Sequence, residues 1–91
     1  MERHRSIEVN FNFAEVTPEE ISDDIRAVSA ARPQAVATYC TNLRAAPLAK
    51  SLEQELGIVL LDTVSTAVWG MLRLAGADPA QVRGWGRLFQ A

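Results

Sequence analysis

The chain has 91 residues, of which 48% are hydrophobic, and this size predicts a single small domain with a modest core. A formal net charge of −2 with dispersed basic residues argues against nucleic acid or an anionic membrane surface as a partner, and no apolar run reaches the ~18 residues of a membrane span. One cysteine permits no internal disulfide, and the charged start lacks a signal-type apolar stretch, so we expect a cytoplasmic protein.

An alternation of apolar and polar side chains predicts a first strand over residues 6–14, with one face exposed to solvent. The hydrophobic side chains that share its other face are Ile7, Val9, Phe11 and Phe13. A strand that is wet on one side belongs near the edge of a sheet or at a domain boundary.

A helix is predicted to begin after Thr17. Pro18 suits the first helical position, and Glu20 stands three residues after the cap, which completes a capping box. Pro33 is expected to stop this helix. Its buried stripe at helical spacing consists of Ile21, Ile25 and Val28.

The centre of the chain predicts a strand, a polar turn and a second helix. Residues 35–39 are apolar with β-favouring Val, Thr and Tyr, which is typical of a strand covered on both faces of a parallel sheet. Thr41 and Asn42 interrupt this run, and a helical pattern follows from Pro47 until Gly57. The apolar residues of that pattern are Leu48, Leu52 and Leu56.

Cys40 falls at the carboxyl end of the predicted central strand, the edge at which ligands bind in open α/β sheets. The helix that follows would point its N-terminus at this edge and favour the thiolate, so Cys40 could act as a nucleophile or move protons. Its free N–H groups, with Thr41 and Asn42, would hold a carboxylate or an enediolate. The alternative is that Cys40 is a small buried hydrophobe, because free cysteine is among the most buried residue types.

The last part of the chain predicts another strand at 58–61 and another helix that ends at Gly76. Asp62 or Thr63 would cap this helix, and the same side chains would share the edge of Cys40, where they could instead line a pocket. The side chains expected on its buried face are Val68, Met71, Leu72 and Ala75. Strands alternating with helices predict an α/β fold with a parallel sheet.

Several segments carry a resemblance to a known family. They are TPEEI (17–21), CTNL (40–43), LEQELGI (52–58), WGMLRLAG (69–76) and GWGRLF (84–89). Together they resemble the C-terminal part of the aspartate/glutamate racemase superfamily, nearest the maleate cis-trans isomerase and arylmalonate decarboxylase branch. The resemblance implies the three-layer, Rossmann-like half of a racemase fold, a short parallel sheet with flanking helices. It also implies one domain over residues 1–91, with a core at 17–76 and a tail at 77–91.

The family resemblance implies a cofactor-independent enzyme in which two similar domains each direct one catalytic cysteine at a small carboxylic acid. The sequence has no cluster of metal-ligating residues, so we expect no metal site. Cys40 matches the cysteine of the second domain, and Thr41 and Asn42 match positions that hold substrate oxygens. Small glycines follow this cysteine in the arylmalonate decarboxylases, so the isomerase or racemase side is favoured here. The tail GRLF (86–89), however, is more similar to the decarboxylases.

By the plan of that family the chain lacks the first domain and its cysteine. Inverting a carbon centre needs a group on each face, so we expect a truncated isomerase or racemase that is inactive alone. The alternatives are an arylmalonate decarboxylase-like enzyme with a single protonating cysteine and a non-catalytic oligomeric interaction module. Trp85, Leu88 and Phe89 would lose their covering, so we expect a homo-oligomer or a separate first-domain polypeptide as partner.

Overall fold

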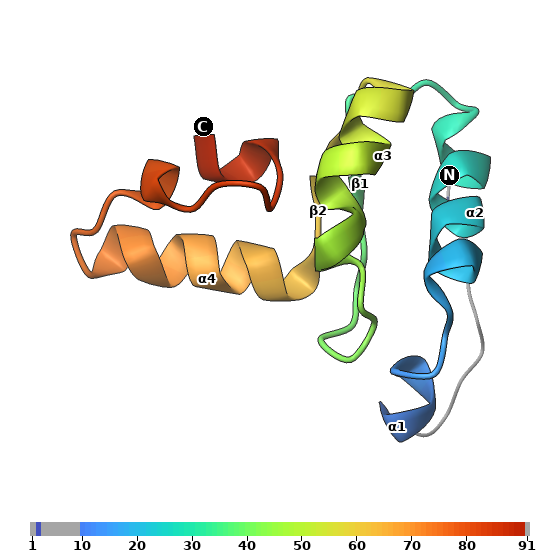
Figure 1. Cartoon of the computed structure of the whole chain (residues 1–91), viewed down its shortest axis with the longest axis horizontal. Coiled ribbons are helices and arrows are strands. Elements are labelled where there is room, and N and C mark those ends of the chain that lie inside the picture. Colours follow the sequence, from blue (N-terminus) through green and yellow to red (C-terminus); the bar gives the residue numbers. More distant parts are fainter. Residues whose placement is uncertain (1, 3–9, 91) are drawn as a thin grey trace.

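Two short parallel strands form the centre of the fold in the computed structural model, which describes residue 2 and residues 10–90. Strands β1 (Ala35–Ala37) and β2 (Val59–Leu61) pair with Val36 beside Leu60, and helix α3 (Ala49–Leu56) lies on the connection between them. The remaining elements are α1 (Asn10–Phe13), α2 (Pro18–Ser29), α4 (Thr63–Leu74) and the 3-10 helices η1 (Ala46–Leu48), η2 (Pro79–Gln81) and η3 (Arg87–Gln90) (Figure 1). The predicted α/β class, with a parallel sheet and flanking helices, is confirmed.

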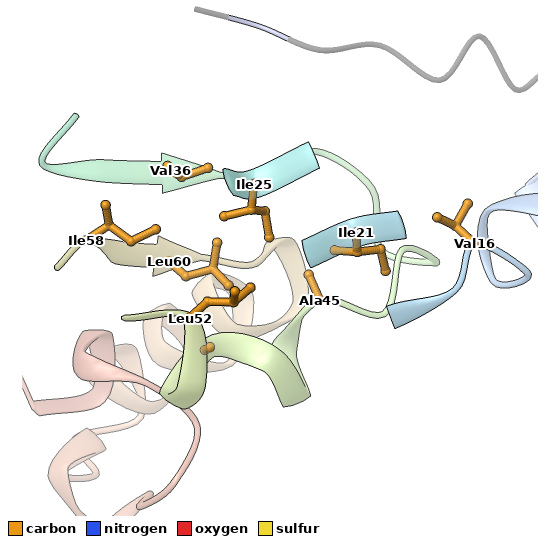
Figure 2. Close-up of a cluster of buried hydrophobic side chains, with 9 residues drawn as sticks. Val16, Ile21, Ile25, Val36, Ala45, Leu52, Ile58 and Leu60 are labelled. Carbon is orange, nitrogen blue, oxygen red and sulfur yellow. The ribbon is translucent and has the colours of Figure 1, made fainter. Parts of the chain in front are cut away.

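The hydrophobic core lies between the sheet and helices α2 and α3. Figure 2 shows side chains of both helices gathered against those of the two strands. A fully buried Ile or Leu contributes roughly 1.5–3 kcal/mol by leaving water, so the burial of this cluster stabilises the fold. Its buried members are Val16, Ile21, Ile25, Val36, Ala45, Ala49, Leu52, Ile58 and Leu60.

Helix α2 begins where the sequence predicts. The Glu20 N–H donates to Thr17 Oγ1 at 3.1 Å, and the Thr17 N–H donates to Glu20 Oε1 at 3.2 Å, so the capping box is formed. Helix α3 ends at Gly57, whose φ of 67° lies in the left-handed region that favours glycine. The start of α2 and the end of α3 are therefore determined by residues close to them in the sequence.

The predicted first strand is wrong over residues 10–13, which form helix α1. The rest of that prediction, residues 6–9, lies outside the described residues. A strand needs a neighbour for its backbone groups, and no described strand pairs with residues 10–13. The 10–13 segment satisfies its backbone locally instead, with the Val16 N–H donating to the Phe13 carbonyl at 3.3 Å.

The expectation that the central strand is covered on both faces is also wrong. Val36 is buried, but Ala35 and Ala37 on the opposite face are exposed, and Tyr39 beyond them is 92% exposed. Helices α2 and α3 cover one face of β1. Alanine methyl groups cost little in water, so this composition is compatible with an open face.

Helix α4 lacks the buried stripe that its sequence predicts. Of the predicted residues, Met71 is 61% exposed and Ala75 is exposed, while Val68 and Leu72 are only half-buried. Ser65 is the buried residue of the helix. Helix α4 extends away from the sheet and packs against η2 and η3 (Figure 1). Of the tail residues expected to be uncovered, Trp85 is 47% exposed, but Phe89 is only 3% exposed, so that part of the expectation is wrong.

Within the described residues, no helix is long and apolar enough to cross a membrane.

Candidate active site

Cys40 lies just beyond the carboxyl end of β1, as the sequence predicts. The strand ladder continues to Thr38, whose N–H donates to the Leu61 carbonyl at 3.1 Å. Cys40 follows two residues later as a half-buried free thiol. Cys40 as a residue is therefore neither sealed in the core nor fully exposed to solvent.

Thr63, the first residue of α4, ties this end of β1 to the start of the helix. Its Oγ1 accepts a hydrogen bond from the Cys40 N–H at 3.0 Å and donates one to the Thr38 carbonyl. Both bonds are partly buried, so water competes with them less than at the surface. The hydroxyl group of Thr63 therefore fixes the backbone that carries the thiol.

The N-terminus of α4 is organised by Asp62. This residue is 1% exposed, and its Oδ2 accepts a hydrogen bond from the Ser65 N–H at 2.9 Å. Of the two caps that the sequence allows, Asp62 and Thr63, the structure therefore has Asp62. Thr63 and Val64 are the first two helical residues, so their N–H groups have no acceptor within the helix. Val64 is 43% exposed, so this first turn reaches solvent at the edge where Cys40 lies.

The helix start beside Cys40 is thus that of α4, whereas the sequence predicted that of the following helix. Thr41 and Asn42 are exposed in a turn in which the Leu43 N–H donates to the Cys40 carbonyl at 3.3 Å, and α3 begins only at Ala49. The order of elements along the chain identified the correct edge of the sheet but assigned it the wrong helix. The roles of Thr41 and Asn42 in holding substrate oxygens stay predictions.

A second buried acid, Glu53, lies at the edge of β2 that faces away from β1. Its Oε2 accepts the Leu60 N–H at 2.9 Å and its Oε1 accepts the Arg87 N–H at 2.8 Å, so one carboxylate joins α3, β2 and the tail. Gly86 fits against it with a φ of 117°, and a Cβ there would lie 3.1 Å from the Ala49 Cβ.

An open cavity of about 540 Å³ adjoins Glu53. Basic and amide side chains from α3 and the tail line this cavity, and Cys40 does not. These lining residues include Lys50, Gln54, Arg83, Arg87 and Gln90. The cavity is therefore separate from the edge of the sheet that carries the thiol.

Within residues 10–90 and at residue 2, no three His, Cys, Asp or Glu side chains gather into a group that could hold a metal ion. The arrangement around Cys40 consists of a thiol, two exposed polar side chains and the first turn of a helix. A thiol can exchange a proton or form a bond to carbon, and polar side chains and helix N–H groups can stabilise negative charge on a substrate oxygen.

This architecture is that of a fragment of a racemase-type α/β fold. The chain superposes, with a TM-score of 0.83 and 23% sequence identity, on a cysteine-to-serine mutant of the Nocardia farcinica maleate cis-trans isomerase that carries a covalently bound succinylcysteine intermediate. The match covers 91% of this chain and 34% of the isomerase, so the chain spans about a third of that protein's length. None of the curated proteins matches the sequence.

The model of the arylmalonate decarboxylase family matches residues 4–89. The chain therefore belongs to this family, within the maleate isomerase and arylmalonate decarboxylase branch of the aspartate/glutamate racemase superfamily. The predicted resemblance is confirmed.

Proposed function

We propose that this chain supplies one half of a cofactor-independent isomerase or racemase site for small carboxylic acids. Cys40 is the acid/base or nucleophilic group, and Thr41 and Asn42 hold substrate oxygens. The observation that carries the proposal is the tether from Thr63 to the Cys40 N–H, which supports a thiol held at the sheet edge beside the start of α4. Membership of the family adds to this support.

In the proton-transfer form of the reaction, the Cys40 thiolate removes the proton from the carbon next to a carboxylate. The electron pair of the C–H bond moves into that carboxylate and gives an enediolate. The first-turn N–H groups of Thr63 and Val64, with the side chains of Thr41 and Asn42, stabilise the oxygen charge.

In the addition form, the thiolate attacks one carbon of a cis double bond while the other carbon takes a proton from water. The former double bond is then a single bond and rotates, and a base of the second half of the site removes a proton from that carbon as the thiolate leaves, which gives the trans acid. No atoms or electrons are gained or lost. The succinylcysteine in the Nocardia isomerase mutant is an adduct of this kind on a cysteine other than the one replaced by serine, so it supports thiol addition as the chemistry of that protein.

Racemisation needs a second proton-carrying group on the far face of the substrate, and the chain contains one cysteine. The proposed half-site is therefore inactive alone. We propose that the second group comes from a polypeptide segment equivalent to the first domain of the family or from a second copy of the chain.

The family model favours a second candidate, a decarboxylase that acts on arylmalonates. Loss of carbon dioxide from a malonate leaves an enediolate that needs one proton on one face, so Cys40 would suffice. A third candidate is a non-catalytic oligomeric interaction module, which the exposed apolar side chains of α4 support.

Assays of the wild type and of a Cys40→Ala variant with maleate, aspartate and aryl malonates separate these candidates. The half-site predicts no turnover by the isolated chain but a covalent maleate adduct on Cys40, detected by mass spectrometry and absent from Cys40→Ala. Decarboxylation that disappears in Cys40→Ala would establish the second candidate. Turnover that survives in Cys40→Ala would rule out both enzymes, and the absence of both adduct and turnover would favour the interaction module.

A further inference from the structure

The tail of the chain forms a closed loop beside α3. The Gln90 side-chain amide donates to the Val82 carbonyl at 3.0 Å, and the Arg87 N–H donates to Glu53 Oε1 at 2.8 Å. The 3-10 helices η2 and η3 also pack against each other. The backbone that carries Arg83 and Arg87 is therefore held in place against the helix.

Three cationic side chains line the cavity between this loop and α3. Lys50 comes from α3, and Arg83 and Arg87 come from the loop. All three are exposed, and no described acid forms an ion pair with any of them. The one acid among the described lining residues, Glu53, accepts a backbone N–H at each of its oxygens. The lining therefore carries a net charge of +2, although the whole chain has a net charge of −2.

Lys50 occupies an unfavourable place in α3. It is the second residue of the helix, and the first turn contains no acid. The N-terminus of a helix carries a partial positive charge, so Lys50 is repelled by the helix as well as by the two arginines of the cavity. A bound anion would offset both repulsions. Residues that break a local rule in this way are expected at functional sites.

We propose that this cavity binds the phosphate group of a small molecule. A guanidinium group donates two parallel N–H bonds to an oxyanion, and a lysine ammonium binds phosphate as a point charge. Two guanidinium groups and one ammonium suit a dianion with three free oxygens better than a single carboxylate. The cavity volume of about 540 Å³ lies within the ~300–1,000 Å³ of small-molecule sites, so it also accommodates the organic part of a phosphate ester.

Amide NMR spectra of the 91-residue chain, titrated with inorganic phosphate at pH 7 and constant ionic strength, test this site. We expect saturable shifts at Gly84 and Gly86, which line the cavity. The dissociation constant should rise roughly 10- to 100-fold in Arg87→Gln and in Lys50→Gln, because each loses a charge-assisted hydrogen bond. Arg32→Gln removes an equal charge from an exposed arginine outside the cavity and should match the wild type.

Urea unfolding of the variants separates lost binding from lost folding. Arg87→Gln keeps the backbone N–H that Glu53 accepts, so its midpoint should be close to that of the wild type. Lys50→Gln removes a cation from the first turn of α3, so its midpoint should equal or exceed the wild-type value while its phosphate affinity falls. Cys40 does not line the cavity, so Cys40→Ala should bind phosphate as the wild type does. This test therefore stands whether or not Cys40 is catalytic.

The absence of saturable shifts in the wild type would overturn the proposal. Equal weakening in Arg32→Gln and Arg87→Gln would also overturn it, because it would show attraction to the net charge of the chain and not to this cavity. Succinate that shifts Gly84 and Gly86 at concentrations as low as phosphate does would overturn the assignment to phosphate. Glycerol phosphate that binds as tightly as inorganic phosphate, with the same dependence on Lys50, would support an ester as the ligand.

Discussion

Replacing Thr63 by valine tests whether its hydroxyl fixes the backbone of Cys40. Valine keeps the shape of the side chain but can neither accept the Cys40 N–H nor donate to the Thr38 carbonyl. Leaving partly buried backbone groups without partners costs about 1–3 kcal/mol. In a domain of this size each kcal/mol lowers the midpoint of thermal unfolding by roughly 4–8 °C, so we expect a decrease of about 10 °C.

Thermal unfolding followed by circular dichroism, with Thr66→Val as a matched control, measures this effect. Thr66 is also half-buried in α4, but its hydroxyl only donates to the Thr63 carbonyl of the preceding turn at 3.0 Å. Its loss should therefore lower the midpoint much less. Equal midpoints for the two variants would refute the claim that the Thr63 hydroxyl joins α4 to β1.

Glu53→Gln should destabilise the fold by about 1–3 kcal/mol in urea unfolding, because an amide accepts only one of the two N–H groups that the carboxylate accepts; a wild-type midpoint would contradict this. Gly86→Ala should be more destabilising than Gly84→Ala, since both glycines have positive φ but only Gly86 lacks space for a Cβ; equal losses would show that the close approach is unimportant. Hydrogen bonds from the Arg26 guanidinium, at 2.7 and 2.9 Å, lower the pKa of Glu55. This stabilisation is present above the ordinary glutamate pKa and is lost as pH falls through the lowered pKa, so the urea midpoints of the wild type and Glu55→Gln should converge in acid. A difference between the two urea midpoints that stays constant with pH would refute this contribution of the Arg26–Glu55 pair.

The sequence predicts the elements with strong local signals. Thr17 and Glu20 fix the start of α2, Gly57 fixes the end of α3, and Asp62 fixes the start of α4. The position of Cys40 at the carboxyl edge of the sheet also follows from the order of strands and helices. These features depend on residues within a few positions of one another, so a single sequence carries them.

The remaining features depend on contacts between distant segments. The bond from the Cys40 N–H to Thr63 spans 23 positions, and that from the Arg87 N–H to Glu53 spans 34, so no local pattern predicts either. Apolar side chains in β1 and α4 indicate surfaces suited to burial, but not whether this chain supplies the covering layer. The exposure of Ala35 and Met71 is therefore information that the structure adds.

The reactivity of Cys40 tests the proposed function most directly. The rate at which iodoacetamide alkylates Cys40 at pH 7 is measured by mass spectrometry. The rate in the folded chain is compared with the rate in the chain unfolded in urea, where Cys40 is an ordinary solvated thiol. A thiol held beside the start of α4 should react faster in the folded chain, and a small dicarboxylate should slow it by occupying the same edge. Slower alkylation in the folded chain, unaffected by dicarboxylate, would contradict a catalytic Cys40.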